Sequence, residues 1–481
     1  MKRIQYLMLM ILCAWSIQIH AQEGWKHGRL RVSGDAHFLE TTKDIPFFWL
    51  SDAAFDIFQK LSFEEIRLYL KNRQSKGFNV IQAAILAENN GLKALNRYGS
   101  VPLVDENPNA PNERYFELVD TTVKVAARRD IFVALYPTWG DKVTEGWGSG
   151  PAVFTSRNAY NYGRWLGERY KNDENIIWVL GGDRPPVKDA SDWLPIWRAM
   201  ARGLQEGSSY KAFITYYPPS GEKSSSQYLH NETWLNLNMI HGGNEKYNLP
   251  VWQWVERDTK LPSAKPTLDG GINFEDHPVG NTAGKSFTDY DVRKQAYRSV
   301  FAGASGVGYG NQAVWQFAGS VESGAGQMGL YWKDGLDRPG AFSAGYVRKL
   351  IECRPFMGRV YDPSIIKEGQ EEGDNFITAF RGKNNDYAMV YLPVGKTITV
   401  NTSFMKSDDI KIWWYDPRIG LMVRGISVYR RGLLQLTPPT LGVGQDWVLV
   451  LDDPEYQYRP PGDWISERAQ QIKEIDDIPE Q

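Results

Sequence analysis

Short apolar runs alternate with amphipathic helical stretches from residue 45 to about residue 345. This alternation is typical of strand–helix units that build a parallel sheet. The runs with the character of strands are Pro46–Leu50, Phe78–Leu86, Ile131–Tyr136, Ile176–Leu180, Ala212–Tyr217, Trp234–Ile240, Lys265–Asp269 and Gly303–Tyr309. These runs predict an α/β fold, a closed (β/α)8 TIM barrel.

Several helices in this region are well marked. Ser62 and Glu65 form a capping box before an amphipathic run that Gly77 ends. Helical spacing recurs over Tyr115–Arg129 and Ser156–Lys171. The long, irregular stretches near strand ends are Asn89–Asn112, Pro218–Thr233 and His241–Asn248. In a barrel, long loops after strands build the substrate pocket.

The pattern changes after about residue 360. Short strands separated by Gly, Asp, Asn and Pro turns are expected at Phe376–Arg381, Tyr387–Leu392, Thr397–Asn401, Ile410–Tyr415 and Trp447–Leu451. They predict a small all-β sandwich. We therefore divide the chain into a barrel over residues 22–360, a β-sandwich over 361–455 and a polar tail over 456–481. The aromatic run Trp413–Tyr415 leads us to expect that the sandwich packs on the barrel as a structural cap.

The first residues have the pattern of a secretory signal peptide. Lys2 and Arg3 form a positive region, an apolar stretch follows, and Ala21 is a small residue suited to cleavage. The apolar stretch is too short for a membrane-spanning helix. We expect cleavage near Ala21 and export of the protein to the periplasm or the extracellular space.

Charge and cysteine content exclude several functional classes. The net charge is −2 and becomes more negative when residues 1–21 are removed, which argues against nucleic-acid binding and membrane insertion. After cleavage only Cys353 remains, so stability must come from a large core and not from disulfides. The histidines lack the spacing of metal ligands, and no phosphate-binding loop is present. The sequence predicts no metal and no cofactor.

Asp183 is a candidate catalytic group. It follows the strand Ile176–Leu180 and two glycines, and the Pro185–Pro186 pair stiffens the loop beyond it. In a barrel, the carboxyl ends of all strands open onto the face that carries active sites. The alternatives are structural, namely a cap for a helix near Ser191 or a partner for Arg184.

Glu275 is the second candidate, five or more residues past the strand Lys265–Asp269. Asp269 and Asp276 compete with it in the same segment, and it could instead be an ordinary acid of a surface loop. Glycoside hydrolysis uses one carboxyl group to protonate the leaving oxygen and another to attack the sugar or activate water. The residues alone do not say which acid has which role.

Further polar and aromatic residues lie at or near strand ends. Asp52 could bind sugar hydroxyls or cap the helix that follows it. The other expected substrate-binding residues are Trp139, Tyr217, His241, Asn244, Tyr309 and Trp315. Aromatic rings of this kind offer platforms for the C–H faces of sugars, although each could also belong to the core.

The motifs resemble the apiosidase-like glycoside hydrolases, which are related to glycoside hydrolase family 140. The strings that carry the resemblance are PFFWLSD, GFNVIQ, YPTWG, NIIWVLGGDRPP, TYYPPSG, LNLNMIHGG, KPTLDGGINFED and FAGASGVGYGNQAVWQ. The later strings YAMVYLP, IKIWWYDPRIG and QDWVLVLDD are similar to a β-domain appended to that family and often labelled collagen-binding. The resemblance covers residues 28 to 453.

The resemblance implies a carbohydrate substrate, Asp183 as general acid/base, Glu275 as nucleophile and retention of anomeric configuration. It also implies release of a terminal sugar from a plant-type side chain. The chain departs from the family pattern where Gly271 replaces a usual glutamate and where His241 and Asn244 replace Gln and His. These departures support an alternative, a catalytically degenerate carbohydrate-binding protein on the same scaffold.

Overall fold

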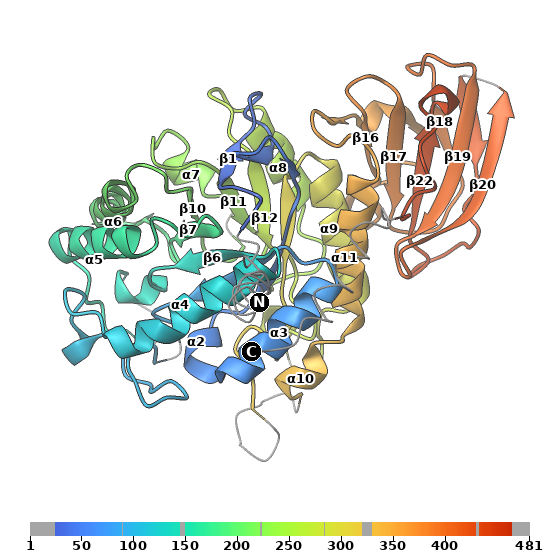
Figure 1. The fold of residues 1–481 in the computed structure, drawn as a ribbon. Coiled ribbons are helices and arrows are strands. Elements are labelled where there is room, and N and C mark those ends of the chain that lie inside the picture. The colour runs from blue at the N-terminus through green and yellow to red at the C-terminus, as the bar shows by residue number, and fades with distance from the viewer. Residues whose placement is uncertain are drawn as a thin grey trace, which may run out of the picture.

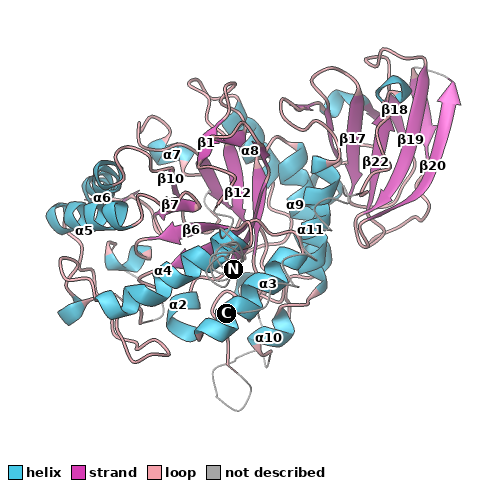
Figure 2. Ribbon diagram, in the orientation of Figure 1, coloured by secondary structure: helices cyan, strands magenta, loops and turns pink. Residues whose placement is uncertain are grey.

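The computed structural model describes residues 25–88, 90–144, 150–221, 224–282, 284–319, 330–429 and 432–463. Its larger part is a parallel eight-stranded sheet surrounded by helices (Figures 1 and 2). In spatial order the strands are β10 (Ile214–Tyr216), β7 (Ile176–Leu180), β6 (Phe132–Tyr136), β5 (Val80–Ala84), β4 (Trp49–Ala53), β13 (Gly306–Tyr309), β12 (Thr267–Gly271) and β11 (Asn238–His241). A parallel bridge from Thr215 to Leu237 joins the edges β10 and β11. The prediction of a TIM-type barrel is confirmed.

The helices lie outside this sheet, as Figure 2 shows. They are α2 (Ile57–Lys60), α3 (Phe63–Ser75), α4 (Glu113–Arg128), α5 (Ser156–Arg169), α6 (Leu194–Gly207), α7 (Ser226–Leu229), α8 (Val251–Thr259), α9 (Asp289–Phe301), α10 (Trp332–Gly335) and α11 (Pro339–Glu352). The predicted capping box at the start of α3 is present, because Ser62 accepts from the amide of Glu65 and Glu65 accepts from the amide of Ser62.

The first barrel strand differs from its prediction. The run Pro46–Leu50 is divided between two sheets: β3 (Pro46–Phe47) pairs with β2 (Leu39–Thr41), and β2 pairs with β1 (Leu30–Val32), whereas β4 begins only at Trp49. A continuous apolar run cannot show where the chain passes from one sheet to another. As a consequence, Asp52 lies within the barrel strand and not after it.

The C-terminal part is a β-sandwich, as predicted. One sheet has the order β14 (Val360–Tyr361), β16 (Thr378–Arg381), β17 (Tyr387–Leu392), β22 (Trp447–Asp452), β19 (Asp409–Asp416) and β20 (Leu421–Tyr429). The other contains β15 (Ile366–Glu368), β18 (Ile398–Asn401) and β21 (Leu433–Leu436). The alternation of the strand side chains separates an inner face from a face that meets the barrel.

The sandwich packs against α9 and α11 of the barrel (Figure 1). Tyr297 of α9 stacks on Tyr391 of β17 with ring centroids 4.8 Å apart, and Arg293 forms an ion pair with Asp446. This contact agrees with the expected structural cap. The predicted signal peptide and residues 464–481 of the predicted tail lie outside the described residues. Among the helices described, none has the length and apolarity needed to cross a bilayer.

Candidate active site

Asp183 lies in a sharp turn that follows β7. Gly181, Gly182 and Asp183 all have positive φ, at 91°, 52° and 60°. A Cβ on Gly181 would come within 2.4 Å of the carbonyl oxygen of Tyr217, and one on Gly182 within 2.5 Å of the amide of Gly140. The glycines therefore allow the backbones after β6, β7 and β10 to approach one another. This packing fixes the turn that presents Asp183.

The carboxylate of Asp183 has one firmly held oxygen. Its Oδ1 accepts a hydrogen bond from the amide of Ser220 at 2.8 Å and lies 3.1 Å from Nδ1 of His241. Its Oδ2 lies 3.4 Å from Nη1 of Arg184, and the side chain is 27% exposed. The contacts of Oδ1 fix the orientation of the group, and Oδ2 has the longer contact with Arg184. This arrangement suits exchange of a proton with a bound ligand.

A cluster of aromatic side chains reaches this carboxylate through His241. Tyr217 lies beside His241, with ring centroids 4.5 Å apart, and Trp139 packs on Phe55 at 4.6 Å. Phe55 also contacts Tyr217 and Trp315. The predicted residues Trp139, Tyr217, His241 and Trp315 therefore come together with Asp183 at the carboxyl ends of the barrel strands.

Three polar atoms in this group are buried without a hydrogen-bond partner among the described residues, the Nε1 of Trp139, the Oη of Tyr217 and the Nε2 of His241. The last two lie around Gly271 of β12. A Cβ at that position would lie 2.4 Å from Tyr217 Oη and 2.6 Å from His241 Cδ2. Buried polar atoms usually have a partner, so these two are available to hydroxyl groups of a ligand.

Glu88 and Arg184 complete the charged part of the site. The sequence offered Arg184 as a structural partner of Asp183, which the ion pair at 3.4 Å bears out, and it did not single out Glu88. Arg184 is 1% exposed at its side chain and donates through Nη2 to Glu88 at 2.5 Å. The same guanidinium faces Asp183, so one cation contacts two carboxylates. Burial raises the pKa of Glu88, and the charges of Asp183 and Asp141 act in the same direction, against the opposite effect of Arg184. Glu88 follows β5 as Asp183 follows β7. The argument that a carboxylate after a barrel strand lies at the active-site face would therefore also have identified Glu88.

A buried ion pair lies behind Glu88. The ammonium group of Lys142 contacts the carboxylate of Asp141 at 2.8 Å and donates to the carbonyl oxygens of Ala87 and Glu88. Burial lowers the pKa of Lys142. Its hydrogen bonds connect the loops after β5 and β6 and so fix the backbone of Glu88.

Among the described residues, Glu275 makes no hydrogen bond or ion pair with the group around Asp183. Glu275 is 1% exposed. Its Oε2 accepts a hydrogen bond from Tyr309 Oη at 2.6 Å, and its Oε1 accepts one from the amide of Gly340 at 2.9 Å. Gly340 is in the first turn of α11, where a carboxylate stabilises the helix dipole. Burial raises the pKa of Glu275. Asp276 binds Arg338 just before the same helix, so this segment holds the start of α11.

Three other predicted site residues have partners within the protein. Asp52 is fully buried and forms an ion pair with Arg73 at 3.0 Å. Tyr309 donates to Glu275, as described above. The Oδ1 of Asn244 accepts from the amide of Phe274 at 2.8 Å. Each of these contacts is structural, and neither alternative for Asp52 that the sequence left open, sugar binding or helix capping, describes its ion pair.

Asp269, the remaining competing carboxylate, points from β12 toward α9. It accepts from Ser299 Oγ at 2.6 Å and from Gln295 Nε2 at 3.0 Å. Burial raises its pKa to about 6. It supports the strand that carries Gly271 from behind.

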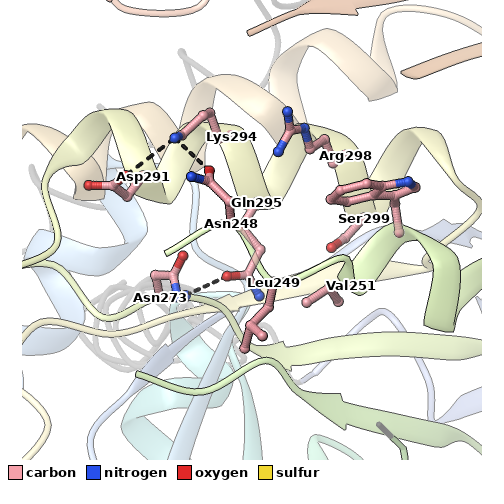
Figure 3. Close-up of a pocket in the computed structure, with 10 residues that line it drawn as sticks. Asn248, Leu249, Val251, Asn273, Asp291, Lys294, Gln295, Arg298 and Ser299 are labelled. Carbon is pink, nitrogen blue, oxygen red and sulfur yellow. Dashed lines mark hydrogen bonds and ion pairs between the residues drawn. The ribbon is translucent and has the colours of Figure 1, made fainter. Parts of the chain in front are cut away.

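A small hollow lies apart from this site, between α8, α9 and the segment after β12 (Figure 3). Its polar side chains bind one another: Lys294 donates to Asn248 and pairs with Asp291, and Asn273 donates to the carbonyl of Gly243. We assign no ligand to it. Within the described ranges, no group of three or more His, Cys, Asp or Glu residues has the geometry to hold a metal ion.

Comparison with known proteins shows the family to which the chain belongs. Residues 33–358 match the model "Apiosidase-like, catalytic domain", and residues 360–452 match "Putative collagen-binding domain of a collagenase". A crystal structure of a glycoside hydrolase family 5 protein from Bacteroides vulgatus is 28% identical, with a TM-score of 0.84 over 93% of this chain and 99% of that chain. A second structure, named glycoside hydrolase, is 28% identical, with a TM-score of 0.81 over 90% and 98%. A comparison with curated proteins finds no match. The chain belongs to the apiosidase-like glycoside hydrolases.

Proposed function

We propose that this hydrolase cleaves a terminal sugar from a plant-type polysaccharide side chain and that Asp183 is its general acid/base. The observation that carries the proposal is the carboxylate of Asp183, which is 27% exposed and is held at Oδ1 by Ser220 and His241, whereas Oδ2 lies 3.4 Å from Arg184. From Oδ2 a proton passes to the glycosidic oxygen as the bond from that oxygen to the anomeric carbon breaks. A water molecule then supplies the hydroxyl group that the anomeric carbon gains and returns a proton to Asp183. Trp139 and Trp315 supply rings for the sugar. Export to the periplasm or the extracellular space is part of this proposal.

The proposal does not extend to Glu275 as nucleophile or to retention of configuration, both of which the family resemblance implies. Attack on an anomeric carbon requires a carboxylate oxygen free to form a bond. Both oxygens of Glu275 instead accept hydrogen bonds, from Tyr309 and from Gly340. A residue that is 1% exposed and has both oxygens hydrogen-bonded offers little access to an anomeric carbon, so its contacts favour a role in holding α11.

A hydrolysis screen tests the proposal. The secreted protein is incubated with plant cell-wall glycans, and the released sugars are separated by chromatography, with Asp183→Asn in parallel. Release of one monosaccharide by the wild type and none by the variant is expected. Oligosaccharides as the first products would contradict the exo mode. Proton NMR of the first product anomer distinguishes retention from inversion.

The second candidate function is carbohydrate binding without cleavage. Gly271 supports it, because no side chain projects from the end of β12 toward Tyr217 and His241. Glycan affinity without sugar release, unchanged by Asp183→Asn, would favour this function over hydrolysis.

A further inference from the structure

We propose that Glu88 acts through Arg184 as a positioning residue that keeps the proton of Asp183 available for the reaction. The inference rests on the proposed function of Asp183. Glu88 itself is not required to touch the substrate. The negative charge of Glu88 offsets the positive charge of the Arg184 guanidinium group beside Asp183.

The geometry is a chain of three side chains. Arg184 is almost completely buried, and its Nη2 donates to Glu88 at 2.5 Å, whereas its Nη1 donates to the carbonyl of Asp183 at 2.8 Å and faces Oδ2 at 3.4 Å. The shorter, charge-assisted contact is therefore the one with Glu88. The hydrogen bond with Glu88 fixes the plane of the guanidinium group. The carboxylate of Asp183 lies farther from the guanidinium group, at 3.4 Å.

The electrostatic consequence follows from the needs of a general acid. A proton donor must carry its proton when the substrate arrives, and a cation beside a carboxyl group favours loss of that proton. The negative charge of Glu88 opposes the charge of Arg184 at this place. Burial raises the pKa of Glu88, and Asp183 contributes to the rise, so the two carboxyl groups interact.

The charged or titratable side chains that face Asp183 are those of Arg184, His241, Tyr136, Tyr217 and Glu88. Those that face its partners are Glu245 on Ser220, Asp269 and His277 near His241, and the pair Asp141–Lys142 behind Glu88. Burial raises the pKa of both tyrosines well above 10, so they remain neutral. Lys142 is paired with Asp141, and Glu245 reaches Asp183 only through Ser220. Glu88 is the carboxylate that shares a guanidinium with Asp183.

The test is the pH dependence of kcat/KM for Glu88→Gln on the glycan that the wild type cleaves. Because the variant removes a negative charge that faces Arg184, the basic limb of the profile should move to lower pH. Above that limb, kcat/KM should fall about tenfold for each unit. Glu88→Asp keeps the negative charge, so the basic limb of its pH profile should lie close to that of the wild type. Glu232→Gln is the matched control, since Glu232 also pairs with an arginine, Arg198, but in the segment that leads into β11.

The outcomes separate this inference from the proposed function. If the wild type cleaves the glycan and the Glu88→Gln profile keeps its limbs, even at a uniformly lower rate, Glu88 is merely structural and the inference is overturned. If the wild type releases no sugar, the proposed function has failed, and a carbon-13 NMR titration of labelled aspartate decides the inference. The signal that disappears in Asp183→Asn should titrate at lower pH in Glu88→Gln, and an unchanged titration would overturn the inference.

Discussion

Asp183 and Glu275 both follow buried barrel strands, yet their surroundings differ in almost every respect. The Asp183 side chain is 27% exposed and has one oxygen held by Ser220 and His241, whereas Glu275 is 1% exposed and has both oxygens occupied. The partners of Asp183 are in the loops and strand ends of the site. The partners of Glu275 are Tyr309, which belongs to the layer between barrel and helices, and the first turn of α11.

This difference shows that a carboxylate after a strand is not yet a catalytic carboxylate. Side chains of a barrel strand alternate between the interior and the helix layer. Three residues with positive φ form the turn that carries Asp183, and its carboxylate meets Ser220 after β10 and His241 at the end of β11. The segment of Glu275 instead continues beside the extension of β13, where its amide donates to Gly310 and its carbonyl accepts from Gln312. The direction after the strand decides the function of the acid.

The largest expected effect is that of Asp183→Asn. Loss of the group that protonates the leaving oxygen should lower turnover by about 10²- to 10⁴-fold. The fold should remain, because an amide occupies the same volume and still offers an oxygen to Ser220. Sugar release gives the rate and thermal unfolding gives the control. Turnover within twofold of the wild type would remove Asp183 from the reaction.

The next effect comes from a matched pair of glycines. Gly271→Ala places a Cβ against Tyr217 and His241, and Gly340→Ala places one 2.6 Å from Oε2 of Glu275. Displacing the side chains beside Asp183 should lower turnover on the order of 10²-fold with little loss of stability. Gly340→Ala should instead lower the unfolding temperature and leave most of the turnover. If the two variants lowered turnover equally, the surroundings of Glu275 would matter for the reaction as much as those of Asp183, which would contradict our account.

Asp269 provides a test by stability and pH. Its pKa in the folded protein is about 6, above the ordinary value of 3.8, because the group is buried. The stability that its protonated form contributes is therefore fully present below about pH 3.8 and is lost as the pH rises through about 6. Relative to Asp269→Asn, the wild type should lose roughly 3 kcal/mol of unfolding free energy over this range. Urea unfolding at several pH values measures it, and a constant difference would contradict the buried titration.

Glu275→Gln should have the smallest effect on free energy. The variant loses a charge at the start of α11 and weakens the hydrogen bond from Tyr309, which together should cost about 1–2 kcal/mol. Urea unfolding at neutral pH measures this loss, and Glu232→Gln serves as the control on an Arg–Glu pair elsewhere. An unchanged unfolding free energy would show that Glu275 does not hold α11.

The sequence was sufficient for the architecture, because helical and strand periodicities are local properties. The capping box at Ser62, the barrel strands and the sandwich all follow from such patterns. The division of Pro46–Leu50 between two sheets was not predictable, since both parts are equally apolar. The same is true of Asp52, whose partner Arg73 is on α3 and becomes visible only after packing.

The site could be predicted in part. The strand-end rule brought Asp183, Trp139, Tyr217, His241 and Trp315 to one place, because the carboxyl ends of parallel strands share a face. Position at a strand end does not say which way a side chain points. For this reason Tyr309 and Asn244 were expected to bind substrate, although both have partners within the protein. The strand-end rule also passed over Glu88, although that residue follows β5 within four positions of its end.

The comparison of sugar release by Asp183→Asn and Glu275→Gln on one glycan, with the folding of both variants verified, is the most direct test. Our account predicts that Asp183→Asn loses at least about a hundredfold of the wild-type rate, while Glu275→Gln stays within about tenfold. Equal losses of several orders of magnitude in two folded variants would contradict it. Glu275 would then be the nucleophile, in spite of the two donors that hold it in this structure.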